Sequence, residues 1–163
     1  MNMKAPLNKK ADVAHEVVRE VMGSHAPTED SSVKLSVERY FSADFAKREW
    51  EAVFAKTWQI ACREDHVAKP GSYYVFELGS ESILVSRGSD GVIRAFDNVC
   101  RHRNNILVQS RYGSARSFAC RFHRWAWDST GKLSNIPDRE TFPGLPADQE
   151  LALKPLRCEL WGG

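Results

Sequence analysis

The amino-acid sequence predicts a mostly β fold, an antiparallel sandwich or barrel preceded by N-terminal helices. Its length of 163 residues corresponds to about one domain with a single hydrophobic core. From residue 58 onward, apolar residues alternate with a period of two, which is typical of strands. The alternating runs are short and are separated by Gly and Ser residues that favour tight turns. Many short antiparallel strands are therefore expected.

Two helices are predicted ahead of the strands. Residues 9–22 place valines four apart, which puts them on one face of a short amphipathic helix before a Gly-Ser-His-Ala-Pro-Thr segment. Ser42 is the expected N-cap of a second helix over residues 43–56, whose apolar residues form one stripe. We assign residues 1–37 to an N-terminal arm and residues 38–163 to the domain.

The strands follow in order along the chain. Three candidates, SYYVFELG, ESILVSR and VIRAFDN, form a predicted meander over residues 72–98 with turns at Gly79 and Gly91. Further short strands are expected at residues 106–109, 116–119, 125–128 and 132–134. Residues 135–155 contain four prolines, so a loop is predicted there before alternation resumes in LKPLRCELW. Because the chain ends inside an alternating segment, we expect it to be a fragment of a longer protein.

Composition and charge exclude two classes of partner. The 23 Lys and Arg residues against 21 Asp and Glu give a formal charge of only +2, which argues against a nucleic-acid binder. No apolar run approaches the roughly 20 residues that cross a bilayer, and the N-terminus lacks the apolar run of a signal peptide. A cytoplasmic protein without a membrane partner is predicted, and its four cysteines are expected to serve a metal, catalysis or the core.

Two short segments carry the chemistry. Cys100 and His102 form a C-x-H pair, and Cys120 and His123 form a C-x-x-H pair, with 17 residues between His102 and Cys120. Neighbouring antiparallel strands lie about 4.8 Å apart, so two such loops can converge on one site. Two Cys and two His suit either a tetrahedral zinc or a mixed [2Fe–2S] cluster. Zinc motifs usually pair like with like, whereas each segment here gives one thiolate and one imidazole, which favours the cluster.

The pattern C-x-H-x₁₇-C-x₂-H, with an aromatic pair behind it, resembles a Rieske iron–sulfur motif. The similarity extends over residues of about 38 to 163 and is to the N-terminal part of the α (large) subunit of Rieske non-haem iron, aromatic-ring-hydroxylating oxygenases. The resemblance implies a Rieske-type fold with two cluster-binding hairpin loops. It also implies that Cys100 and Cys120 hold one iron, and that His102 and His123 hold the other.

The sequence departs from its relatives at four positions in these loops. Respiratory Rieske proteins carry an additional, disulfide-bonded cysteine in each loop, where this chain has Asn105 and Phe122, so the oxygenase type is favoured. Family members usually have Gly where this chain has Asn104 and Arg124. If the position after His123 needs a positive φ, Arg124 adds strain, because Arg tolerates left-handed backbone much less than Asn does. The usual Tyr is Phe122, which removes a hydroxyl that could reach a ligand sulfur.

The resemblance implies an oxidoreductase role in aromatic-ring hydroxylation, by a dioxygenase or a monooxygenase. The domain would take electrons from a ferredoxin or reductase and deliver them to a mononuclear Fe(II) in a C-terminal catalytic domain, with other oxygenase subunits as partners of the full-length protein. This chain offers no matching His pair and carboxylate for that iron, so we predict that it lacks the mononuclear site. A stand-alone Rieske ferredoxin and a zinc-stapled interaction module are the alternatives.

The two other cysteines and the basic residues around the loops are interpreted without a metal-binding role. Cys62 shares its strand phase with Trp58 and Ile60, and Cys158 is in phase with Leu156, so both cysteines are predicted to be small core residues. Basic residues surround the ligand loops and form either a solvated rim or a docking patch for an acidic electron donor. They are Arg101, Arg103, Arg111, Arg116, Arg121 and Arg124.

Overall fold

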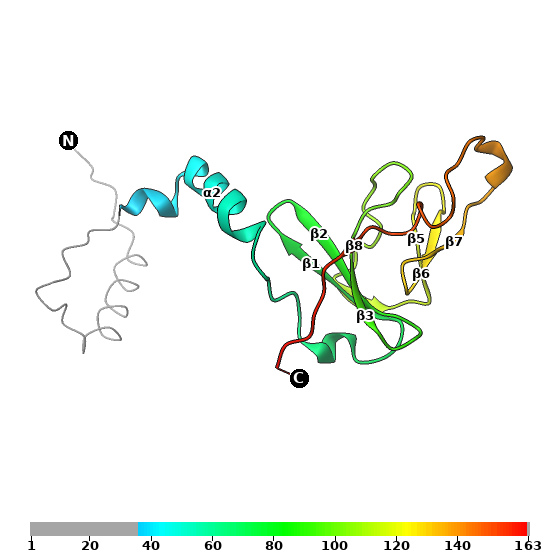
Figure 1. Cartoon of the computed structure of the whole chain (residues 1–163), viewed down its shortest axis with the longest axis horizontal. Helices are drawn as coiled ribbons and strands as arrows, with labels where there is room; N and C mark the ends of the chain where they lie inside the picture. The colour runs from blue at the N-terminus through cyan, green and yellow to red at the C-terminus, as the bar shows by residue number, and fades with distance from the viewer. Residues whose placement is uncertain (1–35, 163) are drawn as a thin grey trace, which may run out of the picture. The chain divides into compact units, whose positions relative to one another are not determined.

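The structure is a computed structural model that describes residues 36–162 (Figure 1). The chain divides into two compact units, one ending at Trp58 and the other beginning at Gln59. The helix predicted over residues 9–22 lies outside the described residues, as does most of the predicted arm. Within residues 36–162, every helix is too short or too polar to span a bilayer.

The first unit is helical. A 3-10 turn, η1 (Val37–Tyr40), precedes α2 (Ala43–Glu49), and the chain then widens into a π-helix, η2 (Trp50–Phe54). Ser42 caps α2 as predicted, because its Oγ accepts a hydrogen bond from the N–H of Phe45 at 3.2 Å. The helical path ends two residues before the predicted limit of 56, where the Thr57 hydroxyl donates to the carbonyl of Val53 at 2.9 Å.

The second unit consists of two antiparallel sheets (Figure 1). The larger sheet has the order β4-β1-β2-β3-β8, formed by Tyr112–Ser114, Ser72–Leu78, Glu81–Arg87, Ile93–Asp97 and Pro155–Leu156. The smaller sheet has the order β5-β6-β7, formed by Ser117–Ala119, Ala126–Asp128 and Leu133–Asn135. Two 3-10 turns, η3 (Glu64–Val67) and η4 (Arg139–Thr141), complete the unit. Of the two predicted architectures, the sandwich is correct and the described strands close no barrel.

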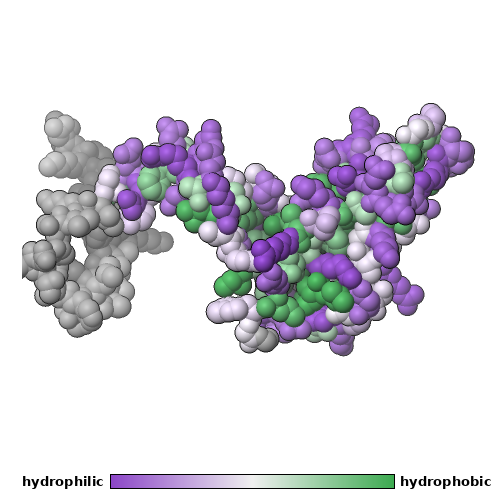
Figure 2. All heavy atoms as spheres, viewed as in Figure 1, coloured by the Kyte–Doolittle hydropathy of each residue, from purple (hydrophilic) through white to green (hydrophobic). Residues whose placement is uncertain are grey.

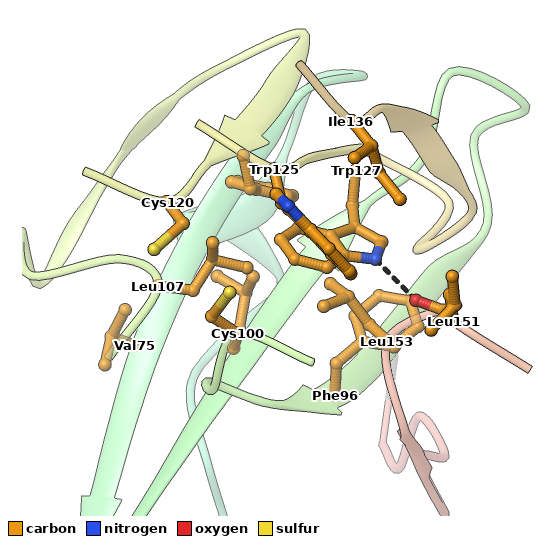
Figure 3. Packing of buried hydrophobic residues seen from close by; sticks show 12 residues of the cluster. Val75, Phe96, Cys100, Leu107, Cys120, Trp125, Trp127, Ile136, Leu151 and Leu153 are labelled. Carbon is orange, nitrogen blue, oxygen red and sulfur yellow. Dashed lines mark hydrogen bonds between the residues drawn. The ribbon is translucent and has the colours of Figure 1, made fainter. Parts of the chain in front are cut away.

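Both faces of the larger sheet are covered, because alternate residues of its central strands face opposite ways. Leu84 belongs to the main core shared with the smaller sheet, whereas the next residue, Val85, belongs to a second cluster on the other face. The main core contains Trp127, whose indole N–H donates to the carbonyl of Leu151 at 2.8 Å (Figure 3). A Cβ at Gly131 would overlap the ring of Phe96, and its φ of +87° also favours glycine at this turn.

Two predicted strands are absent from the described residues. Residues 106–109 form no strand and make only an isolated bridge between Val99 and Ile106, because their polar main chain is bound by a buried side chain described below. The alternating residues around Trp58 and Ile60 also form no strand, and these two side chains are 57% and 82% exposed. The strands predicted within 72–98, 116–119, 125–128 and 132–134 are present with ends shifted by a few residues at most.

Candidate metal centre

Two six-residue loops position the candidate ligands. The first ligand loop, residues 100–105, follows β3, and the second ligand loop, residues 120–125, joins β5 to β6. In both loops the first residue makes the same two main-chain hydrogen bonds. The N–H groups of Asn104 and Arg124 donate to the carbonyls of Cys100 and Cys120 at 2.9 and 3.0 Å. The N–H groups of these cysteines donate in turn to the sixth residues, Asn105 and Trp125, both at 2.8 Å.

The predicted ligands meet in two pairs, each with one member from each loop. The thiols of Cys100 and Cys120 lie close enough to shift each other's pKa, and their residues are 2% and 1% exposed. The imidazole rings of His102 and His123 lie with centroids 4.6 Å apart. Figure 3 shows the side chains of Cys100 and Cys120 among the residues of the main core, to which both belong. The structure therefore brings all four predicted residues together.

The environments of the two thiols differ. Burial raises the pKa of the Cys100 thiol, and its hydrogen bond to Cys120 adds to this increase, against the opposing effect of the His102 N–H. Burial also works to raise the pKa of Cys120, but hydrogen bonds from the N–H groups of Phe122 and His123, with help from Cys100 and Asn105, outweigh it and lower that pKa. The two loops thus supply N–H donors that stabilise negative charge on sulfur.

His102 is held by aromatic rings. Its imidazole stacks on Trp125 with centroids 4.6 Å apart and an angle of 7° between the planes, and Phe142 contacts both rings edge-on. Burial lowers the pKa of His102, and the nearby His123 and Arg103 lower it further, which favours the neutral imidazole that binds metals. The buried Nδ1 of His102 has no hydrogen-bond partner. A buried nitrogen without a partner is costly, unless it is a ligand.

These residues fit an iron–sulfur cluster. The donor set of two cysteines and two histidines is the one that a Rieske [2Fe–2S] centre requires, and the unpartnered Nδ1 of His102 is available for a metal. Within residues 36–162, no three His, Cys, Asp or Glu side chains are grouped closely enough to hold one metal ion. An arrangement in two pairs suits a two-iron cluster better than it suits a single zinc ion.

The two positions that usually carry glycine both have left-handed backbone. Asn104 has a φ of 56° and Arg124 a φ of 60°, as the resemblance implied. Asn accommodates this conformation readily, whereas Arg pays a steric cost for it. The same turn is therefore built from two residues with different strain.

Sequence reasoning missed two polar residues that hold the loops. Asn98 is fully buried, and its side chain binds both the N–H and the carbonyl of Val108 at 2.9 and 2.7 Å, as well as the Ser82 hydroxyl at 3.0 Å. Asn105 donates from its side-chain amide to the Sγ of Cys120 at 3.7 Å. An Asn two residues before a candidate ligand was the available signal for the first, because buried amides usually hold irregular loops.

The basic residues around the loops are at the surface. All six arginines named above are exposed, and none of them forms an ion pair with a carboxylate in residues 36–162. Phe122, at the tip of the second ligand loop, is also 71% exposed and contacts the ring of His123. Figure 2 shows mostly hydrophilic residues over the end of the domain that carries these loops in Figure 1.

The other cysteines lie elsewhere. Cys62 and Cys158 are half-buried and pack against the second cluster, as predicted for small core residues. Burial raises the pKa of both thiols. Neither belongs to the ligand loops, so they provide internal controls for experiments on Cys100 and Cys120.

Comparison with known proteins identifies the family of this domain. The Rieske [2Fe-2S] domain family matches residues 57–147, which include both ligand loops. The chain is 34% identical over 136 residues to the α subunit of benzene 1,2-dioxygenase from Pseudomonas putida, covering 83% of this chain and 30% of that protein. It is 38% identical over 116 residues to the α subunit of chlorobenzene dioxygenase from Cupriavidus sp. strain PS12, covering 71% of this chain and 26% of that protein.

Solved structures show the same relationship. Naphthalene 1,2-dioxygenase with indole in its active site superimposes with a TM-score of 0.66 at 35% identity, covering 72% of this chain and 27% of that chain. A quaternary ammonium Rieske monooxygenase superimposes with a TM-score of 0.69 at 31% identity, covering 75% and 34%. The chain thus spans about a third or less of the length of these relatives. It belongs to the Rieske [2Fe–2S] domain family, in the type found in the large subunits of aromatic-ring dioxygenases.

Proposed function

We propose that this domain is the electron-entry module of an aromatic-ring-hydroxylating oxygenase. In this proposal Cys100 and Cys120 hold one iron of the cluster, and His102 and His123 hold the other. The observation that carries it is the pairing of these side chains across two loops, together with the unpartnered Nδ1 of His102. When bound, the cluster supplies a one-electron carrier. The electron would pass on to a mononuclear iron in a catalytic domain.

The residues of the chain contribute orientation and electrostatics. Main-chain N–H groups of the two loops donate to the cysteine sulfurs and so favour thiolates. Trp125 and Phe142 fix the plane of His102 and exclude water from one side of it. His123 is half-buried, next to the exposed Phe122. This position supports the proposal that electrons enter and leave through the imidazole pair, near the surface.

The proposal is tested by spectroscopy of the anaerobically purified chain. It should be red-brown and, after reduction, give a Rieske-type EPR signal. A colourless protein with stoichiometric zinc would instead support the zinc-stapled interaction module.

The expected cytoplasmic location stays a prediction, as do the substrate class and the partner subunits.

The electron donor is proposed to be an acidic ferredoxin or a reductase that docks on the basic rim. Because four rim arginines flank the ligands themselves, steering should speed association at low salt. Replacing two of them, Arg103→Gln with Arg121→Gln, should slow stopped-flow reduction by an acidic ferredoxin by roughly tenfold at low ionic strength.

The matched control lowers the net charge by the same two units at positions outside the ligand loops. Arg63→Gln with Lys69→Gln removes two exposed positive charges from the segment next to η3. That variant should be reduced at nearly the original rate. Equal slowing in both variants would show that net charge, rather than a docking patch, governs the rate.

A further inference from the structure

The sixth residue of each ligand loop reaches across to a ligand of the other loop. Trp125 of the second ligand loop stacks on His102 of the first. Asn105 of the first ligand loop donates a hydrogen bond to Cys120 of the second. The two contacts are reciprocal but chemically different, since one is a ring stack and the other is a directed N–H to sulfur.

Asn105 contacts both candidate cysteines. Its carbonyl accepts the N–H of Cys100 at 2.8 Å, which closes the first loop. Its side-chain Nδ2 donates to the Cys120 Sγ at 3.7 Å, within the range of N–H to sulfur bonds, and also donates to the carbonyl of Ile106 at 3.1 Å. The second bond fixes the amide, so that its other N–H is aimed at the sulfur. No other side chain in residues 36–162, apart from the partner thiol, makes a hydrogen bond to either ligand sulfur.

We infer that Asn105 is a positioning residue that clasps the two ligand loops together and raises the reduction potential of the cluster. The inference rests on the proposed assignment of Cys120 as a ligand. Its basis is geometric: one residue binds the main chain of one cysteine and the sulfur of the other. The clasp forms between protein groups alone, so the two loops are held in register without the metal.

The sign of the effect follows from electrostatics. Reduction of a bound cluster would make the centre that Cys120 helps to hold more negative by one electron. An N–H aimed at the Cys120 sulfur stabilises the more negative, reduced form more than the oxidised form. Removing this donor should therefore lower the potential. Because the contact is partly buried, water replaces it only incompletely.

The direct test is Asn105→Leu, which keeps a similar volume and removes the amide. We expect a redox titration followed by EPR to show the reduction equilibrium shifted about tenfold against the reduced form, equal to about 59 mV lower for one electron. The resonance Raman bands of the iron–thiolate bonds should also shift. Asn135→Leu, at an exposed position in β7, is the matched control and should leave both readouts unchanged.

A conservative variant separates the amide from the shape of the side chain. Asn105→Gln retains the N–H donor on a longer stem, and it should recover part of the potential. If Asn105→Leu loads little iron while Asn105→Gln loads well, the clasping role is supported. Poor loading in Asn105→Gln as well would show that a retained amide does not restore the site, which overturns the inference.

Failure of this inference is distinguishable from failure of the proposed function. A wild-type protein without a Rieske-type EPR signal would refute the ligand assignment itself. A wild-type protein with that signal, and an Asn105→Leu variant of unchanged potential and unchanged Raman spectrum, would overturn only the role of Asn105.

Discussion

The two ligand loops follow one main-chain course and are held in place in different ways. Both close with the same pair of main-chain hydrogen bonds, and both have a left-handed fifth residue. Yet histidine is the third residue of the first loop and the fourth of the second. Loop geometry, rather than the spacing between Cys and His, is therefore the repeated unit of this site. Each loop can then present one sulfur and one imidazole.

The anchors of the loops differ more than their backbones. The second ligand loop is the tip of a hairpin, because β5 and β6 pair on either side of it. The first ligand loop has β3 on one side only, since residues 106–109 form no strand. There the side chain of Asn98 takes over the main-chain hydrogen bonds that a partner strand would satisfy. The Asn98 side chain thus satisfies main-chain groups beside the first ligand loop, as strand pairing does beside the second.

Replacing a cysteine in either ligand loop should have the greatest consequence, because both loops share this residue. Cys100→Ser or Cys120→Ser should each abolish cluster binding, because each loop contributes one of only two thiolates. Iron content and the EPR signal measure this loss. Cys62→Ser and Cys158→Ser change the same chemical group outside the loops and should retain full iron content. A variant of Cys100 or Cys120 with normal iron content would refute the assignment.

The second effect tests the difference in anchoring. Asn98→Leu should lower the free energy of unfolding by about 2–4 kcal/mol, because it leaves the buried N–H and carbonyl of Val108 without partners. Urea unfolding of the metal-free protein, followed by circular dichroism, gives this value. Cluster loading should fall as well, because the first ligand loop loses the anchor that holds Cys100 and His102 in place.

A loss below about 1 kcal/mol would contradict this account of Asn98. It would mean that the isolated bridge between Val99 and Ile106 is enough to hold the first loop. The control is Ser134→Ala in β7, an exposed position where a change of less than about 0.5 kcal/mol is expected.

The same contrast explains which parts of the molecule are predictable from sequence. The strands within 72–98 follow from alternation and turn residues, because those signals are local. Residues 106–109 are Ile-Leu-Val-Gln and favour a strand by composition as well, but composition does not determine the main-chain partners, and Asn98 decides where those hydrogen bonds go. The three-residue β4 was missed, since its pairing with β1 is set by tertiary contacts, whereas β8 lies within the alternating segment LKPLRCELW.

The site divides in the same way. The four candidate ligands stand out in the sequence because they are residue types at a characteristic spacing. The left-handed backbone at Asn104 and Arg124 was suggested only by the resemblance to a family that usually has Gly there. The crossing of Asn105 to Cys120 and of Trp125 to His102 could not be predicted, because it depends on the distance between two loops that are far apart in the chain. Residue 105 was interpreted only as a position without a cysteine. Its amide became informative once the loops were placed in space.

The smallest expected effect compares the fifth residues of the loops. Left-handed backbone costs a residue such as Arg about 1–2 kcal/mol, whereas glycine adds about 0.5–1 kcal/mol of unfolded-state entropy. Arg124→Gly should therefore stabilise the metal-free protein by about 0.5–1 kcal/mol. Asn104→Gly should change stability by less than about 0.5 kcal/mol, because Asn tolerates φ of 56°. Urea unfolding of both variants, with equal denaturant slopes, measures the difference. If both glycines have the same effect, residue type does not determine strain at this turn, and the proposed asymmetry between the loops is confined to their anchors.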